Sequence, residues 1–445
     1  GEEHFMIEEY LVKKITEPVD WKVTVPGSKS MTNRALLLAA LSTGTVRVDG
    51  VLFSDDSRNF LACLVSLGFA VQIEEEKKCV TVTGCGGRIP RGEAAIDVGS
   101  AGTAARFLAA MLGFSDGCYE IRCSAQMKRR PMAELFELLS DAGAKITFLE
   151  EEGHLPVRIT GCRANRTDEA AETPRKLSLD ITKSTQFLSA LLLIAPMVPE
   201  GMKIHITSEK TDGSYIRITR KMMQEFGVSV AFDGRDYEVP RRASYRKEAY
   251  TVEPDMSAAC YFYAAAAVTG GRALVRHVHM DNTQGDLRFL EVLEHMGCTA
   301  DDTPEGVLVT GPADGALRGI TVNMNDFSDQ ALTLAAIAPF ADAPVRIEGI
   351  GHIRGQECDR IHAIQTNLTV LGIWCEEEET AVTIYPGTPH GGRVETYDDH
   401  RVAMAFSLVG LRTDGIVIEN PACCRKTFED YFTVLSELTG KTAES

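Results

Sequence analysis

The sequence predicts an α/β fold of two lobes, each built from three copies of one supersecondary unit. Three observations support this prediction: six nearly all-apolar segments of helical length, a short strand-like segment after each, and a second, amphipathic helix that ends at a glycine. The glycines stand at positions 68, 143, 227, 297, 372 and 440, and are therefore 75, 84, 70, 75 and 68 residues apart. Such a regular recurrence is the signature of a repeated structural unit.

The six apolar segments are expected to form the buried inner helices of the lobes. Ala35–Leu41 and Ala264–Val268 have no polar stripe, and a helix that is apolar on every face must be surrounded by protein. The six segments are Thr32–Leu41, Thr103–Leu112, Ser184–Met197, Ser257–Val268, Ser328–Phe340 and Asp399–Leu411.

Each inner helix is followed by a short strand and then by an outer helix. In Asp56–Leu67 the apolar residues share one face, which predicts a helix with its other side in water. Gly68 is expected to cap this helix in the left-handed conformation. Ala70–Ile73 and Lys145–Phe148 alternate as strands do. The six short strands are expected at Val46–Val48, Tyr119–Arg122, Lys203–Ile206, Ala273–Val278, Val345–Ile347 and Ile416–Glu419.

Two stretches that contain proline are the candidate crossings between the lobes. Pro240–Ala249 is the most linker-like segment between the third and fourth copies, and Thr24–Gly27 precedes the first copy. Glycine and proline suit hinge positions. We therefore expect an N-terminal lobe of residues 25–245 and a C-terminal lobe of residues 1–24 plus 246–445.

The composition of the 445-residue chain is that of a globular protein, with 44% hydrophobic and 24% charged residues. A net charge of −17 disfavours a nucleic-acid partner, because neutralising phosphates requires a basic surface. No apolar run reaches the roughly 18 residues of a membrane span, and the N-terminal segment lacks a signal-peptide pattern. The twelve cysteines include no Cys-x-x-Cys pair, which indicates a reducing cytoplasm.

Charged and hydroxylated residues gather where the inner helices begin, and half of them could be plain N-caps. Capping does not explain Lys29, Arg34, Arg106 and Arg401, because a cation at a helix N-terminus opposes the helix dipole by roughly 0.3–1 kcal/mol. An anion among them would relieve this repulsion, and Gly102 leaves backbone N–H groups open to a phosphate or carboxylate. These positions therefore predict a site for anionic substrates.

Two other kinds of site are disfavoured by the sequence. Pro26–Ser30 lacks the spacing of a nucleotide-binding P-loop. His400 belongs to no cluster with the spacing of metal ligands. We therefore expect neither a nucleoside triphosphate nor a metal.

Seven motifs together resemble the 5-enolpyruvylshikimate-3-phosphate (EPSP) synthase family over nearly the whole chain. They are Pro26-Gly-Ser-Lys-Ser-Met-Thr-Asn-Arg-Ala35, Ala101-Gly-Thr-Ala-Ala-Arg106, Met127-Lys-Arg-Arg-Pro131, Ser184-Thr-Gln-Phe-Leu188, Gln356-Glu-Cys-Asp-Arg360, Asp399-His-Arg401 and Lys426-Thr-Phe428. The resemblance implies the enolpyruvyl transferase fold, an inverse β-prism in which each lobe holds three βαβαββ units. It also implies that the lobes close over the substrates in an interlobe cleft.

The resemblance further implies a reaction. The enolpyruvyl group of phosphoenolpyruvate passes to the 5-hydroxyl of shikimate 3-phosphate with release of phosphate, in the shikimate pathway to chorismate and the aromatic amino acids. Addition needs a base for the hydroxyl and an acid for the methylene carbon, and elimination reverses both roles. No cofactor or metal is required, the two substrates are the expected partners, and the chain is expected to be a monomer.

The resemblance also implies roles for individual residues. Asp329 is the expected base, Glu357 the expected proton donor, and Lys29 the residue that touches both substrates and assists proton transfer. The residues implied for shikimate 3-phosphate are Lys29, Ser30, Arg34, Ser184, Thr185, Gln186, Asp329, His352 and Gln356. Those implied for phosphoenolpyruvate are Lys29, Gly102, Arg130, Gln186, Arg360, Arg401 and Lys426.

The chain departs from the commonest family pattern near these residues. Gln356 stands where lysine is frequent, and His352 where asparagine is frequent. Asp212–Tyr215 replaces Ser-Lys-Pro-Tyr, which makes Ser214 the nearest substitute for a third phosphate-binding hydroxyl. The base, the acid and the arginines are all kept, so activity is expected. Gly102 implies inhibition by glyphosate, which in this family occupies the phosphoenolpyruvate site.

Two alternatives stay open at this point. UDP-N-acetylglucosamine enolpyruvyl transferases share the repeat fold and the donor. They have a Lys-Asn pair where this chain has Lys29 and Ser30, and a loop cysteine that is not obvious near Ser115–Gly117. A degenerate, non-catalytic anion-binding relative would be expected to have lost Asp329 or Glu357, and both are present.

Overall fold

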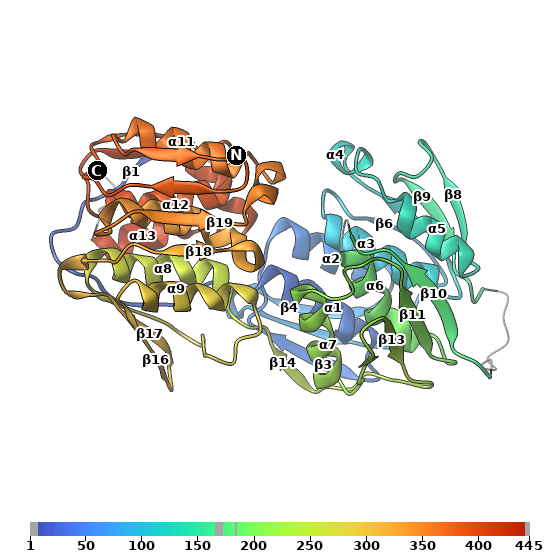
Figure 1. The fold of residues 1–445 in the computed structure, drawn as a ribbon. Helices are drawn as coiled ribbons and strands as arrows, with labels where there is room; N and C mark the ends of the chain where they lie inside the picture. The colour runs from blue at the N-terminus through green and yellow to red at the C-terminus, as the bar shows by residue number, and fades with distance from the viewer. Residues whose placement is uncertain (1–7, 165–171, 183–184, 441–445) are drawn as a thin grey trace, which may run out of the picture. The chain divides into compact units, whose positions relative to one another are not determined.

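The computed structural model describes residues 8–164, 172–182 and 185–440, and the chain divides into two compact units (Figure 1). We call Gly27–Val252 the first lobe. Gly1–Pro26 together with Glu253–Ser445 is the second lobe. None of the helices in the described ranges is long and apolar enough to cross a membrane.

The first lobe contains three four-stranded sheets of the same topology, each with one parallel and two antiparallel pairings. Each unit contains an inner helix and, after it, an outer helix that leads to the antiparallel pair. The inner helices are α1 (Lys29–Leu41), α3 (Gly102–Gly113) and α6 (Gln186–Ile194), and the outer helices are α2 (Asp55–Ser66), α5 (Ala133–Asp141) and α7 (Ser214–Glu225). The sheets run β14 (Ala249–Thr251), β3 (Thr45–Asp49), β5 (Cys79–Thr83), β4 (Ala70–Glu74); β6 (Glu93–Asp97), β7 (Cys118–Arg122), β9 (Val157–Thr160), β8 (Lys145–Phe148); and β10 (Arg175–Leu179), β11 (Met202–Ile206), β13 (Asp236–Val239), β12 (Ala231–Phe232). In the second and third sheets an inner helix joins the two parallel strands, whereas in the first sheet α1 leads into β3 and the parallel partner β14 comes from the end of the lobe's sequence.

The second lobe repeats this plan, with two four-stranded sheets and one three-stranded sheet. Its inner helices are α8 (Met256–Thr269), α10 (Ala331–Ile337) and α12 (His400–Gly410), and its outer helices are α9 (Phe289–His295), α11 (Arg360–Val370) and α13 (Tyr431–Thr439). The sheets run β16 (Thr299–Thr303), β17 (Gly306–Thr310), β15 (Arg272–Val275), β2 (Asp20–Val23); β18 (Thr321–Asn323), β19 (Val345–Glu348), β21 (Val382–Ile384), β20 (Cys375–Glu377); and β1 (Glu9–Leu11), β23 (Ile416–Glu419), β22 (Gly392–Val394).

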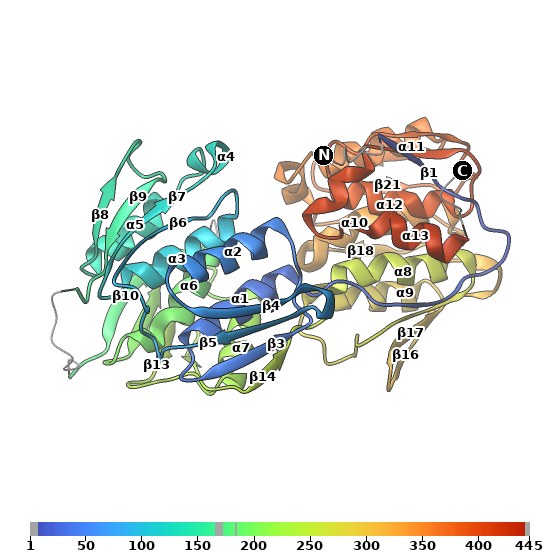
Figure 2. The same cartoon turned by 180° about the vertical axis from the view of Figure 1, so that it is seen from behind.

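Strands at the ends of each lobe's sequence complete sheets begun elsewhere in the chain. β2 pairs in parallel with β15 and β1 antiparallel with β23, so the N-terminal segment lies among the second-lobe elements (Figures 1 and 2). β14 pairs in parallel with β3 and supplies the first strand of the first copy. The division falls at Pro26/Gly27 and Val252/Glu253, beside the expected points at 24/25 and 245/246. Residues 246–252 lie with the first lobe because of the β14 pairing.

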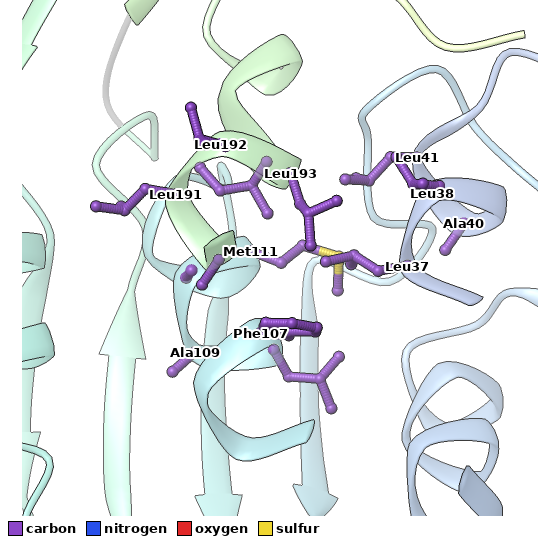
Figure 3. Close-up of a cluster of buried hydrophobic side chains, with 14 of the residues drawn as sticks. Leu37, Leu38, Ala40, Leu41, Phe107, Ala109, Met111, Leu191, Leu192 and Leu193 are labelled. Carbon is purple, nitrogen blue, oxygen red and sulfur yellow. The ribbon is translucent and has the colours of Figure 1, made fainter. Parts of the chain in front are cut away.

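The core of the first lobe lies where its three inner helices meet. Leu37 of α1, Phe107 and Met111 of α3, and Leu191 and Leu193 of α6 are each 0% exposed and form one apolar cluster (Figure 3). Helices this apolar have no polar face to turn to water, so packing against one another is their stable arrangement. The second lobe has its own apolar core built in the same way from α8, α10 and α12.

The predicted fold class is confirmed by the repeated units with their buried inner helices. All six predicted capping glycines have positive φ angles, between 69° and 110°, as a left-handed C-cap requires. Several element bounds differ from the prediction by one or more residues, and a local feature explains three of these differences. α1 begins at Lys29 because Ser28 accepts the Met31 N–H, and β15 ends at Val275 because His277 has φ 68°. The fifth inner helix, expected from Ser328, begins only at Ala331, because the backbone is kinked at Phe327 (φ −145°, ψ 46°) and the residues up to Gln330 form the 3-10 helix η5 (Asn325–Gln330).

Candidate active site

Arg360 is the centre of a charged cluster in the second lobe. Asp359 caps α11 by accepting the His362 N–H at 3.1 Å, which makes Arg360 the first helical residue. Arg360 is only 1% exposed, and such a buried guanidinium needs acceptors on all sides. Among the described residues it donates to Asp399 (2.8 and 3.2 Å), Asp329 (3.0 Å), Glu357 (2.8 Å) and Gln356 (2.6 Å). One cation thus holds both of the expected acid/base carboxylates.

Asp329 is held between two arginines. It lies in the 3-10 helix η5 (Asn325–Gln330), and its second oxygen is 3.5 Å from Arg401 Nη2. Arg401 is placed by Asp399, which caps α12 and accepts the Arg401 N–H at 2.9 Å. Burial acts to raise the pKa of Asp329, but Arg401 and Arg360 outweigh it and hold the pKa below its ordinary value. Asp329 is therefore an ionised carboxylate at neutral pH.

The residues around Glu357 show how the chain accommodates its departures from the family pattern. Gln356 turns its amide oxygen to Arg360, whereas a lysine there would bring a second cation to the same guanidinium. His352 Nε2 lies 2.8 Å from the hydroxyl of Ser328, the residue before the expected base. Glu357 is 41% exposed, more than the other carboxylates that Arg360 holds. Glu357 is therefore the one best placed to exchange a proton with a bound molecule.

Two further carboxyl groups, those of Asp255 and Asp286, lie near Arg401. Asp255 caps α8, and Asp286 in η3 (Gly285–Arg288) accepts a hydrogen bond from Gln330 at 2.8 Å. Burial raises the pKa of both groups, and that of Asp255 to about 6. Burial also opposes the charge of Arg401, but the surrounding acids, with Asp329 foremost, raise its pKa well above the ordinary value. Arg401 stays cationic although it is buried.

Asp255→Asn is expected to stabilise the fold by about 1–3 kcal/mol at pH 7.5 and to have a much smaller effect at about pH 4. The folded protein raises the pKa of Asp255 from 3.8 to about 6, so the folded state binds this proton more tightly than the unfolded chain. Stability is therefore lost as the pH rises from about 4 to 6, where the unfolded chain releases the proton and the folded state still holds it. Asparagine keeps the cap without the charge. Urea unfolding at both pH values measures the effect. A less stable variant at pH 7.5 would contradict it, because the attraction to Arg401 would then dominate.

In the first lobe, Lys29 is the first residue of α1 and pairs with Asp56. Its ammonium lies 2.8 Å from Asp56 Oδ2 and remains 41% exposed. Asp56 lies in the first turn of α2, where the helix dipole favours a negative charge. The carboxylate offsets the unfavourable position of the lysine at a helix N-terminus, and leaves the ammonium accessible to a ligand.

Arg34 is a buried cation without an acidic partner among the described residues. It is 3% exposed, and it donates to Thr219 Oγ1 (2.7 Å), Ser189 Oγ (3.3 Å) and the Ser30 carbonyl (2.9 Å). Burial lowers the pKa of Arg34 to about 10, although Tyr215 acts in the opposite direction. The group is still charged at neutral pH, and a buried charge without a counter-ion is suited to bind an anion.

Two more guanidinium groups surround Gly102 at the start of α3. A Cβ at Gly102 would lie 2.3 Å from Arg130 Nη1 and 2.8 Å from Arg106 Nη1. Arg106 is 9% exposed, and its Nε–H has no acceptor. Burial, followed by the charge of Arg130, lowers the pKa of Arg106 to about 10. Neither arginine pairs with an acid in the described part of the chain, so the bare helix start and the two cations form an anion-binding arrangement.

The remaining predicted residues lie at the start of α6 and shortly before α13. Thr185 caps α6, and Gln186, its first residue, donates from Nε2 to Thr103 Oγ1 at 3.3 Å. Ser184 lies outside the described residues, and so does the side chain of Lys426, whose backbone ends the 3-10 helix η8 (Pro421–Lys426). In the described ranges, no group of three or more His, Cys, Asp or Glu side chains is arranged to hold a metal ion.

The predicted site residues thus divide between the two lobes. The described first-lobe group is Lys29, Ser30, Arg34, Gly102, Arg130, Thr185 and Gln186, and the second-lobe group is Asp329, His352, Gln356, Glu357, Arg360 and Arg401. The sequence analysis missed Asp399, Asp56 and Thr219 as partners of these cations. In the sequence Asp399 stands at a helix start and in the Asp399-His-Arg401 motif, and neither indicates that it pairs with Arg360. Thr219 gives no signal, because it lies 185 residues from Arg34.

Comparisons with known proteins agree with this geometry. Residues 13–435 match the family model of EPSP synthase (3-phosphoshikimate 1-carboxyvinyltransferase). The chain is 41% identical over 431 residues to the 3-phosphoshikimate 1-carboxyvinyltransferase of Trichormus variabilis, covering 97% of this chain and 99% of that protein. It is 39% identical over 436 residues to the enzyme of that name from Vibrio atlanticus, covering 97% and 100%. An EPSP synthase structure from Acinetobacter baumannii is similar, with a TM-score of 0.85 at 25% identity, covering 98% of this chain and 99% of that one.

Proposed function

Because the chain belongs to the EPSP synthase family, we propose that it transfers the enolpyruvyl group of phosphoenolpyruvate to the 5-hydroxyl of shikimate 3-phosphate and releases phosphate. The observation that carries the proposal is that one buried guanidinium, that of Arg360, binds both Asp329 and Glu357. Addition followed by elimination needs two groups that exchange protons in opposite directions. Two carboxyl groups with different surroundings can divide these roles.

Asp329 acts as the base in this proposal. It is ionised before substrate arrives, because Arg360 and Arg401 hold its pKa low. Both arginines are also proposed to bind the phosphate and carboxylate of phosphoenolpyruvate, whose negative charges then compete for the same guanidinium groups. Arrival of this substrate therefore raises the proton affinity of Asp329 and turns a weak base into a stronger one at the time it is needed.

Glu357 acts as the acid. Its contact with Arg360 is a single hydrogen bond of 2.8 Å on a side chain that is 41% exposed. An anion that binds Arg360 displaces this carboxylate more readily than it displaces the fully buried Asp399. Once displaced from Arg360, Glu357 is free to exchange a proton with the bound substrate. It then holds a proton for the methylene carbon.

The first-lobe cations bind the remaining negative charges. Arg34 takes the carboxylate of shikimate 3-phosphate, and Ser184 and Thr185 take its phosphate at the start of α6. Gly102 and Arg130 take part of phosphoenolpyruvate, and Lys29 touches both substrates. Arg106 joins this group as a further ligand, because its Nε–H has no acceptor and, like Arg130, it has no acidic partner among the described residues.

The proposal is tested by measuring phosphate release with both substrates together and with each alone. Release that requires both phosphoenolpyruvate and shikimate 3-phosphate is the expected result. UDP-N-acetylglucosamine serves as the alternative acceptor, and release with it instead would contradict the proposal. Binding of shikimate 3-phosphate by calorimetry without any release would identify a non-catalytic relative. We place the enzyme in the cytoplasm, which is supported by its twelve free cysteine thiols.

Gly102→Ala is expected to raise the KM for phosphoenolpyruvate by about tenfold or more and to weaken inhibition by glyphosate. The added methyl group lies in the space that the two guanidinium groups share. Stability changes little, because the methyl meets the flexible ends of side chains. The matched control is Gly92→Ala, where a Cβ meets no atom within 4 Å. Steady-state kinetics of both variants measure the effect, and undiminished inhibition of Gly102→Ala would contradict this placement of the inhibitor.

A further inference from the structure

Asp286 is a partly buried carboxyl group to which the proposed reaction gives no role. It lies in η3, and its Oδ2 accepts hydrogen bonds from Ser257 Oγ on α8 and from Gln330 Nε2, the latter at 2.8 Å. No lysine or arginine among the described residues pairs with it. Arg288, in the same 3-10 helix, pairs with Asp326 instead. The carboxyl group is therefore held by neutral donors.

Gln330 connects Asp286 to the proposed base. It is the residue after Asp329, it is 0% exposed, and its amide is engaged at both ends. Nε2 contacts Asp286 and, at 3.5 Å, the Ser257 carbonyl, while Oε1 accepts from Thr333 Oγ1 at 2.8 Å. Because Gln330 follows Asp329 directly and its side chain is held at both ends, it restrains the backbone that carries Asp329. The direction of the base therefore depends on a contact with Asp286.

The charges around Asp286 also connect it to Asp329. The charged and titratable groups that face it are Asp255 and Cys260 on α8, Asp329 on η5 and Arg401 on α12. Burial and Asp329 raise the pKa of Asp286, and Arg401 only partly offsets them. Like charges that share a site disfavour each other's ionisation, so each of the two carboxylates increases the proton affinity of the other.

We propose that Asp286 is a positioning residue for the base: it fixes the direction of Asp329 through Gln330 and places a second acidic group beside it. This inference rests on the proposed function, because it concerns the proton that Asp329 removes from the acceptor hydroxyl. Arg360 and Arg401 keep Asp329 ionised, and the negative charge of Asp286 keeps it from becoming too weak a base. A stronger base removes the hydroxyl proton faster.

Asp286→Asn tests the proposal, because it removes the charge and keeps an oxygen that accepts from Ser257 and Gln330. The pKa of Asp329 is measured from the ¹³C resonance of its carboxyl group in aspartate-labelled enzyme, identified by its loss in Asp329→Asn. We expect this pKa to fall by about 0.5–1. The acid limb of the kcat/KM profile should move to lower pH by the same amount. Substrate ionisation is the same for both enzymes and does not affect the difference.

Two further variants complete the experiment. Asp281→Asn makes the same chemical change on an exposed neighbouring residue and should move neither titration. Ser257→Ala removes a donor that stabilises the Asp286 carboxylate, so it should move both titrations in the same direction by a smaller amount. This variant decides the question if Asp286→Asn does not fold.

An Asp329 titration that is unchanged in both Asp286→Asn and Ser257→Ala would overturn the inference. So would a fall in kcat without any movement of the pH profile, which would indicate a merely structural role. If the wild-type chain released no phosphate while the Asp329 titration still moved, the proposed function would fail and the coupling between the two carboxyl groups would stand.

Discussion

Asp329→Asn is expected to lower kcat for phosphate release by about 10²–10⁴-fold, the range that a general base contributes. Asparagine keeps an oxygen that can accept from Arg360 Nη1, a contact of 3.0 Å in the present structure. The fold and the binding of both substrates should therefore be retained while the proton acceptor is lost. Rapid-quench measurement of phosphate release in a single turnover, with both substrates bound, separates the chemical step from binding.

The matched control for this prediction is Asp326→Asn in the same 3-10 helix. Asp326 is 74% exposed and pairs with Arg288 at 3.0 Å on the surface. The kcat of the Asp326→Asn variant should therefore stay within about twofold of wild type. Equal losses in the two variants would show that the substitution disturbs η5 itself. A full rate in Asp329→Asn would assign the base to another residue, with Lys29 the next to be tested.

Much of the fold can be predicted from the sequence, because the signals involved are local. A helix such as α8, which is apolar all round, is stable only in the interior of its lobe. Gly297 and Gly372 each mark a helix end, because they adopt a backbone conformation that other residues avoid. Element bounds are predicted less well where one residue decides them. The φ of His277 ends β15, and the kink at Phe327 turns a helix start into η5.

The candidate site is predicted less completely, because its contacts join distant segments. In the sequence, Glu357 and Arg360 suggest a plain ion pair three residues apart. The structure adds Asp329 and Asp399, which lie 31 and 39 residues from the arginine, and no local pattern indicates them. The roles of these residues therefore came from resemblance to a family, and they stay predictions until variants are measured.

The pairing of β14 with β3 shows the same limit at the level of the lobes. Ala249–Thr251 is only three residues long and follows a linker-like stretch, so composition alone places it after the crossing. Its partner strand lies about two hundred residues earlier in the chain. A strand that completes a sheet begun so far away cannot be assigned by periodicity, which compares only neighbouring residues.

Arg360→Met is expected to destabilise the fold by about 3–5 kcal/mol at pH 7.5 and to abolish measurable binding of phosphoenolpyruvate. Methionine fills a similar volume but donates no hydrogen bond, so Asp399, whose side chain is 0% exposed, becomes a buried charge that has lost its guanidinium partner. The control is Arg393→Met, which removes an arginine that is 56% exposed from two surface ion pairs. That change should cost no more than about 1 kcal/mol.

The pH dependence identifies the origin of this loss. In the wild type, burial acts to raise the pKa of Asp399, but Arg360 outweighs it and holds the pKa below the ordinary value. A carboxyl group whose pKa is lower in the folded protein than in the unfolded chain stabilises the fold at any pH above its unfolded-state pKa. This stability is lost as the pH falls through its folded-state pKa. In Arg360→Met the unpaired Asp399 takes up a proton far more readily. Urea unfolding should therefore show the two proteins closer in stability at about pH 4 than at pH 7.5.

The double variant Arg360→Met/Asp399→Asn separates the stability effect from the function. Asparagine removes the orphaned charge and keeps an acceptor for the start of α12, so most of the lost stability should return, because the cost arises from leaving one partner of a buried pair behind. Phosphoenolpyruvate binding should not return, since no guanidinium is left to receive the anion. If the double variant stayed as unstable as Arg360→Met, the buried carboxylate would not be the cause, and the packing of Arg360 itself would have to explain the loss.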